Sequence, residues 1–187
     1  EAGKQSRTEF ERVLTLLESL EGDNWQQQTY CTEWKVRDMV AHLAGSMTGS
    51  TSLREFVRQY VTHPYVKAAA NPVDGTNRLQ IEERANQSTA DIIAEFRQNG
   101  PIAIKNRQKL PWLVRQIPIP VVGNFGYLMD IIYPRDEWMH RYDICAATGK
   151  KMVITPEHDG RLLDLVLMDI AHKLKKQLAT RTIVLHI

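Results

Sequence analysis

The sequence is poor in cysteine, and the placement of its cysteines does not suggest a disulfide framework. Only Cys31 and Cys145 occur among the 187 residues; they lie far apart, and neither belongs to a Cys-x-x-Cys pair. Cysteines used so sparingly are typical of proteins in a reducing compartment. We therefore expect a cytoplasmic protein with two free thiols, although the sequence alone leaves a single disulfide open.

Long hydrophobic runs and an excess of one charge are missing as well. No apolar stretch approaches the roughly 20 residues that cross a membrane, and 24 basic residues face 22 acidic ones, for a net charge of +2. This balance favours neither a nucleic-acid nor a membrane partner. The apolar fraction of 43% is ordinary for a globular protein, and 187 residues suffice for one well-packed domain.

Strand patterns and the common catalytic loops are also scarce. The sequence has no glycine-rich phosphate loop, no nucleophile elbow and no dinucleotide fingerprint. It does have apolar residues at helical spacing, as in Phe10, Val13 and Leu17. This periodicity predicts an all-α fold, an antiparallel four-helix bundle with an extra C-terminal helix. The expected helices span about 7–20, 35–61, 76–98, 125–148 and 156–179.

Prolines and glycines set the expected boundaries. Gly100-Pro101 should stop the third helix, and the proline-rich stretch 101–125 should form a long connector. Pro134 should either kink the fourth helix or begin a fresh one. The last residues, 181–187, have a strand pattern, and one strand is not stable alone. We therefore expect residues 1–180 to form the helical domain, and 181–187 either to pair with a partner or to open an α/β domain absent from this sequence.

One face of the predicted fourth helix carries side chains that a core face normally lacks. Asp136 and His140 are four residues apart, so a helix stacks them on one face, where they could chelate one ion. That face also holds Met129 and Ile132, whereas a solvated pair should lie opposite the apolar stripe. His42, on the predicted second helix, is the candidate third ligand. Three nitrogen or oxygen ligands with one open position are typical of catalytic metal sites.

These residues also have simpler interpretations. Asp136 and His140 could belong to an internal salt bridge with Arg37 or Arg54, and His42 could be a hydrogen-bonded residue at the edge of the core. The metal interpretation makes a demand on topology that the alternatives do not. It requires the second and fourth helices to be neighbours in the bundle.

Asp143 is the candidate supporting residue of this site. It follows His140 by three residues and shares its face, and metal-bound histidines usually donate their second ring N–H to a carboxylate or carbonyl. We therefore expect Asp143 to orient a ligand histidine, with Arg141 turned outward. The alternative is an ion pair between Asp143 and an arginine of a neighbouring helix.

Two blocks of the sequence resemble a known family. The first is Trp25 followed by the motif Thr29-x-Cys31-x-x-Trp34-x-Val36-Arg37-Asp38-x-Val40-Ala41-His42-Leu43-Ala44-Gly45. The second is Arg135-Asp136-x-Trp138-Met139-His140-Arg141-x-Asp143-Ile144-x-x-Ala147-Thr148-Gly149. Together they resemble the mycothiol-dependent maleylpyruvate isomerase-like family, part of the DinB-like group of metal-binding four-helix bundles. The resemblance covers residues 7 to about 180.

The resemblance implies a ligand set and a reaction class. The implied ligands are His42, Asp136 and His140, with zinc as the ion and nickel as an alternative in the isolated protein. The implied activity is that of a metal-dependent transferase or isomerase, which uses a low-molecular-weight thiol such as mycothiol and a small electrophilic substrate. A non-catalytic metal-binding or regulatory module on the same fold is the alternative. The sequence assigns no further catalytic residue and leaves open whether the chain forms a homodimer.

Two residues depart from the family's pattern. Lys35 stands where the family usually has a serine or threonine that caps the second helix, so Asp38 should lack its capping-box partner. Pro134 directly precedes the ligand turn and could shift it. Neither departure removes a candidate ligand.

Overall fold

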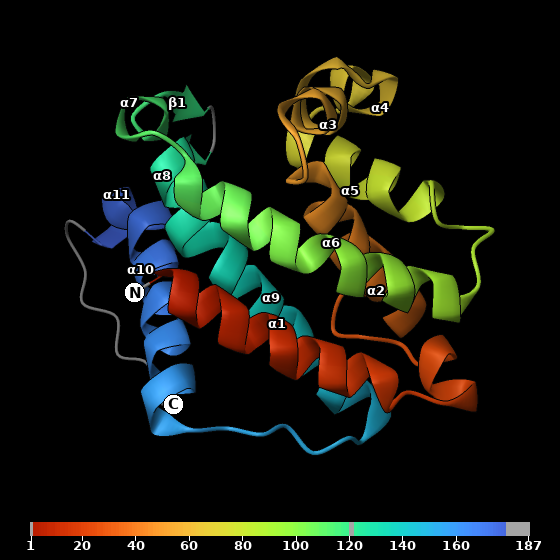
Figure 1. The fold of residues 1–187 in the computed structure, drawn as a ribbon. Helices are drawn as coiled ribbons and strands as arrows, with labels where there is room; N and C mark the ends of the chain where they lie inside the picture. Colours follow the sequence, from red (N-terminus) through yellow and green to blue (C-terminus); the bar gives the residue numbers. More distant parts are fainter. Residues whose placement is uncertain (1, 120–121, 179–187) are drawn as a thin grey trace.

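Four long helices form the bundle in the computed structural model, which describes residues 2–119 and 122–178 (Figure 1). They are α1 (Ala2–Glu18), α2 (Val36–Gly49), α6 (Thr89–Lys109) and α9 (Tyr133–Thr148). Helix α1 packs against α6 and α9, and α2 packs against the same two helices. The predicted all-α bundle is confirmed, and so is the neighbourhood of α2 and α9.

Contacts between the helices give their directions. Thr48 on α2 accepts a hydrogen bond from Asn99 on α6, and Ser50, further along, accepts one from Asn106, so α2 and α6 run parallel. Helices α1 and α9 run the opposite way, antiparallel to these two (Figure 1). Parallel neighbours need a long connection. Here the connection between α2 and α6, which we call the crossover, contains α3 (Leu53–Val57), a π-helical turn (Arg58–Thr62), α4 (Pro64–Ala68) and α5 (Pro72–Glu82).

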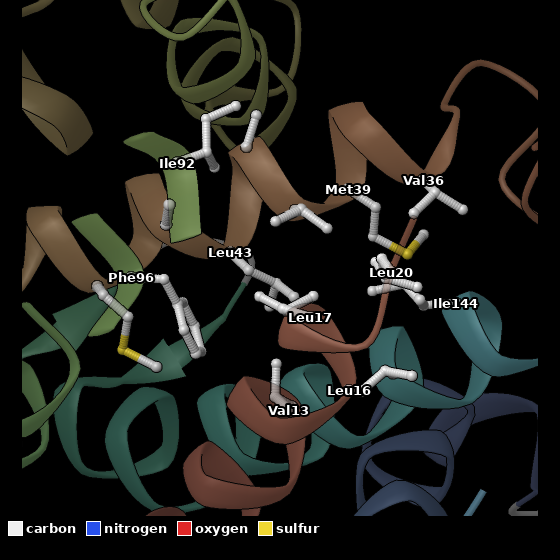
Figure 2. Close-up of a cluster of buried hydrophobic side chains, with 14 of the residues drawn as sticks. Val13, Leu16, Leu17, Leu20, Val36, Met39, Leu43, Ile92, Phe96 and Ile144 are labelled. Carbon is white, nitrogen blue, oxygen red and sulfur yellow. The ribbon is translucent and has the colours of Figure 1, made fainter. Parts of the chain in front are cut away.

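The main core lies between the four long helices. Figure 2 shows the side chains that α1, α2, α6 and α9 direct into it, among them Leu17, Leu43, Phe96 and Ile144, each at most 1% exposed. Burying one such side chain contributes about 1.5–3 kcal/mol. The periodicity of the sequence therefore corresponds to the buried faces of α1, α2 and α6, whereas the buried face of α9 also includes Glu137 and Arg141.

Two expected helices are each divided in the structure. The helix expected over 35–61 ends at Gly49, because Ser52 caps a new helix by accepting from the Glu55 N–H. The helix expected over 76–98 ends at Glu82, and α6 begins after Ser88. The Ser88 and Asp91 side chains form a capping box there.

The expected helix stop at Gly100-Pro101 is wrong, because α6 continues through it to Lys109. Proline normally excludes helical conformations at the preceding residue through a clash with that residue's Cβ, which glycine lacks. Gly100 also lies against the ring of Phe10, where an added Cβ would come within 2.0 Å of a ring carbon. Glycine at 100 therefore relieves the clash with Pro101 and permits the close contact with α1.

The expected connector 101–125 is consequently shorter and partly structured. It contains α7 (Trp112–Arg115) and the short antiparallel strands β1 (Pro118–Ile119) and β2 (Gly123–Asn124). Helix α8 (Phe125–Tyr127) and a π-helical turn (Leu128–Ile132) lead into α9. A second apolar cluster forms here around Leu128 and Met129, with Phe56 of the crossover packed against it.

The remaining elements lie at the two ends of the bundle. A 3₁₀ helix (Gly22–Gln26) joins α1 to α2, and a π-helical turn (Pro156–Gly160) precedes α10 (Arg161–Lys173) and α11 (Lys175–Leu178). Helix α10 packs on α9 and is the expected extra C-terminal helix. The predicted strand 181–187 lies outside the described residues. Within the described ranges, no helix has both the length and the apolar character needed to cross a membrane.

Candidate metal centre

Helix α9 holds Asp136 and His140 at the start of a continuous helical segment. The π-helical turn Leu128–Ile132 passes directly into α9, with the Tyr133 N–H donating to the Leu128 carbonyl. Pro134 is the second residue of α9 and follows residues that are already helical, so its missing N–H leaves one helical hydrogen bond unmade next to the π-helical turn. Asp136 lies in the first turn of α9, as one of the two sequence interpretations expects.

Helix α2 brings His42 to the same place from across the bundle. Its first turn is held by Asp38, whose carboxylate accepts from the Lys35 backbone N–H at 3.0 Å. The expectation that Asp38 lacks its capping partner is therefore wrong in part, because this half of a capping box needs no particular side chain at position 35. His42 follows one turn later and is 6% exposed.

The three candidate ligands converge. Both the His42 Nε2 and the His140 Nε2 lie 3.5 Å from the Asp136 Oδ2, and one ligand atom from each residue lies within 4.8 Å of the other two. The imidazole rings meet edge to face, with centroids 5.1 Å apart. Neither arginine of the salt-bridge alternative lies here. Arg37 instead donates to the backbone carbonyls of Arg84, Ala85 and Gln87.

These separations fit a bound ion better than direct pairing. A separation of 3.5 Å is longer than a normal N–H···O hydrogen bond. Tetrahedral zinc with bonds of about 2.0–2.1 Å would set its N and O ligands about 3.3 Å apart. The other ring nitrogen of each histidine, Nδ1, is buried and has no hydrogen-bond partner in the described part of the chain, so neither ring has the acceptor that metal-bound histidines usually have. Two imidazoles and one carboxylate are also a donor set that suits zinc.

The electrostatics of the triad favour ionised Asp136 and neutral His42. Burial lowers the pKa of His42, and the attraction of Asp136 offsets only part of this effect. Burial alone would raise the pKa of Asp136, but the two imidazoles hold it well below its ordinary range. Burial alone would likewise lower the pKa of His140, which the Asp136 carboxylate instead raises. An ionised carboxylate and a neutral imidazole are the forms that bind metals.

The triad opens onto a cavity of about 680 Å³. His42, Asp136 and His140 all line it, together with Trp34, whose ring lies 5.1 Å from that of His42 and 6.0 Å from that of His140. Sequence reasoning did not assign Trp34 to the site, although it belongs to the first motif. A fourth ligand of a metal held by the triad could approach from this cavity.

Comparison with protein-family models matches residues 6–145 to the mycothiol maleylpyruvate isomerase N-terminal domain. The chain belongs to this family. The match confirms the resemblance drawn from the two motifs and includes all three candidate ligands. Comparison with curated proteins and with solved structures finds no significant match.

Asp143 lies near the site without bonding to it. Its carboxylate is 4.0 Å from the Nδ1 of His140, beyond hydrogen-bonding distance, and burial raises its pKa. No arginine forms an ion pair with Asp143 within the described ranges. Asp143 therefore lies beside His140 without the hydrogen bond that the supporting role requires, and this role stays a prediction.

Arg141 does not turn outward, and that expectation is wrong. Its side chain is 2% exposed and donates to the carboxylates of Glu9 on α1 and Asp159, each at 2.6 Å. His158 adds a contact of 2.7 Å to Glu9. The sequence could not reveal this, because the partners lie far from Arg141 along the chain and meet it only in the folded bundle.

Glu9, His158 and Asp159 also lie close enough together to hold an ion, but their oxygens are already occupied. Arg12 donates to Asp159 at 2.6 Å, from the side opposite Arg141. Burial alone would raise the pKa of Asp159, but hydrogen bonds from Thr155, Trp138 and the two arginines hold it well below its ordinary range. Because the guanidinium groups of Arg12 and Arg141 already occupy these carboxylates, the cluster is an ion-pair network. It connects α1 to α9 and to the π-helical turn 156–160.

A second residue that sequence reasoning missed is Gln80 on α5. It is 1% exposed and close enough to His42 to offset a small part of the lowering of that histidine's pKa by burial. Its amide donates to the Gln59 Oε1 at 2.9 Å, and Gln59 donates in turn to Glu55. The crossover therefore places a buried amide beside His42. No local pattern marked Gln80, because its role depends on how α5 packs against α2.

Proposed function

We propose that this chain binds one divalent ion, zinc in the first instance, through His42, Asp136 and His140, and uses it in a thiol-dependent transferase or isomerase reaction. The observation that carries the proposal is the convergence of these three side chains at the end of an open cavity. Membership of the mycothiol maleylpyruvate isomerase N-terminal domain family supports mycothiol as the thiol to test first.

The chain's own residues would prepare the site for such a reaction. The two imidazoles and the carboxylate hold the ion, and Trp34 shields one side of both rings. A bound zinc ion would act as a Lewis acid and lower the pKa of a thiol next to it. The cavity provides room for the second substrate and reduces its contact with water.

Replacing Asp143 by asparagine should weaken zinc binding while preserving the fold. The carboxylate is positioned to accept from the His140 Nδ1–H after a small movement, and loss of such a partner typically reduces metal affinity about 10–100-fold. Competition with a chromogenic chelator would measure the change. Asp164→Asn, an exposed site on α10, is the matched control and should bind zinc like the wild type. Equal affinity in both variants would assign Asp143 no part in metal binding.

The reaction class can be tested directly on the zinc-loaded chain. Mycothiol, bacillithiol and glutathione would each be supplied with maleylpyruvate, to detect cis–trans isomerisation, or with 1-chloro-2,4-dinitrobenzene, to detect thiol transfer. We expect turnover with at least one thiol, and loss of this turnover after treatment with EDTA or in His140→Ala. Stoichiometric zinc without turnover for any pair would contradict the catalytic proposal and favour a metal-binding module.

A further inference from the structure

The cavity next to the triad is larger than a small acid requires. Its volume of about 680 Å³ falls within the 300–1,000 Å³ typical of sites for drug-sized ligands. The triad, Trp34 and two more residues of α9, Tyr133 and Arg135, line it, and its other walls come from segments outside the four long helices. The cavity can therefore accept a substantial molecular body beside the atoms that would react.

Most of these other walls are apolar. The crossover contributes Phe56, Val61 and Val66, and the segment before α9 contributes Ile119, Phe125 and Ile132. The rings of Phe56 and Phe125 lie 5.5 Å apart, so the two segments meet over the second apolar cluster. Surfaces of this kind gain free energy by contact with hydrocarbon and not with a hydroxylated or multiply charged ligand.

Apart from a metal ion held by the triad, the side chains that line the cavity leave little positive charge for a ligand. Asp169, which is 4% exposed, accepts from Arg135 at 2.8 Å and from Lys173 at 2.9 Å, and Arg135 also lies 3.5 Å from Asp136, so two carboxylates face these two cations. Lys67, at the end of α4, also lines the cavity and has no ion pair within the described ranges. Its exposed ammonium group is therefore available to one anionic group entering at the rim.

We propose that the electrophilic substrate of this site has a bulky apolar body and a single anionic group, with the body against the Phe56 and Phe125 walls and the anion near Lys67. The inference rests on the proposed function for its placement beside the metal. It differs from a small diacid such as maleylpyruvate, for which a second carboxylate would have to be buried against hydrocarbon.

Direct binding tests this proposal without thiol or turnover. The probe is 8-anilinonaphthalene-1-sulfonate, which has an aromatic body and one sulfonate, and its displacement reports competitor affinity on both zinc-loaded and EDTA-treated chain. Linear monocarboxylates from hexanoate to dodecanoate should bind progressively tighter, by up to about fourfold per added methylene. Dicarboxylates of equal length should bind at least about tenfold more weakly. Affinity that is independent of chain length, or equal for both series, would overturn the proposal.

Two matched pairs of variants locate the ligand. Val61→Asp places a charge on the apolar wall and should weaken dodecanoate binding about tenfold or more, whereas Val57→Asp, one turn earlier and outside the cavity, should not. Lys67→Gln should weaken dodecanoate but not dodecanol, whereas Lys105→Gln on α6 should change neither. Wild-type affinity in both Val61→Asp and Lys67→Gln would overturn the proposed position. Binding as predicted without thiol turnover would instead contradict only the catalytic proposal.

Discussion

Replacing Glu9 by alanine should lower the free energy of unfolding by about 3–5 kcal/mol. The Glu9 side chain is fully buried and accepts from Arg141 and His158, so its removal leaves a buried guanidinium with one carboxylate partner fewer. Loss of one partner from a buried ion pair costs this much because the remaining charge has already been withdrawn from water. Urea unfolding followed by circular dichroism would measure the difference.

Glu18→Ala is the control for this prediction. Glu18 lies on the same helix and also pairs with an arginine, Arg97, at 2.7 Å, but these side chains are 47% and 54% exposed. Such exposed pairs contribute about 0–1 kcal/mol. If Glu9→Ala and Glu18→Ala destabilise the chain equally, the buried network does not hold α1 against α9.

The parts of the fold that follow from local periodicity could be predicted from the sequence. The apolar spacing of α1 and α2 matches their buried faces, whereas the buried face of α9 also holds the charged Glu137 and Arg141. The neighbourhood of α2 and α9 follows from placing His42 near His140. The divisions at Ser52 and Ser88 were missed because a single capping residue interrupts a stretch that otherwise looks helical. The passage of α6 through Pro101 was missed because a glycine before a proline normally marks a helix end, whereas here the missing Cβ of Gly100 relieves the clash with the proline.

The residues of the candidate site also fall into those that the sequence predicts and those that only the folded structure shows. Asp136 and His140 are paired by helical spacing alone, and His42 joins them through the packing of one helix pair. Metal binding by the three remains a prediction. The inward turn of Arg141 and the position of Gln80 were beyond sequence reasoning, because each depends on partners from distant segments, Glu9 and the crossover. Spacing along one helix predicts which side chains can lie close together on one face. Burial, which only the folded structure shows, decides which polar groups need a partner.

The metal itself should stabilise the wild-type chain. An ion that binds only the folded state adds about 2.7 kcal/mol when its free concentration is 100 times its dissociation constant. Zinc added to the EDTA-treated protein should therefore raise the free energy of unfolding by about this amount, and elemental analysis should find one ion per chain.

Removing any member of the triad should abolish this stabilisation. His42→Ala, Asp136→Ala and His140→Ala each delete one of three ligands, and we expect zinc affinity to fall on the order of 100-fold or more, beyond the effect of losing a supporting residue. His158→Ala is the matched control, because it removes a histidine from the other cluster that could hold an ion. That variant should be less stable than the wild type, yet gain the same increment from zinc. If His158→Ala loses the zinc increment while the triad variants keep it, the ion binds at the Glu9 cluster and the triad is not the metal site.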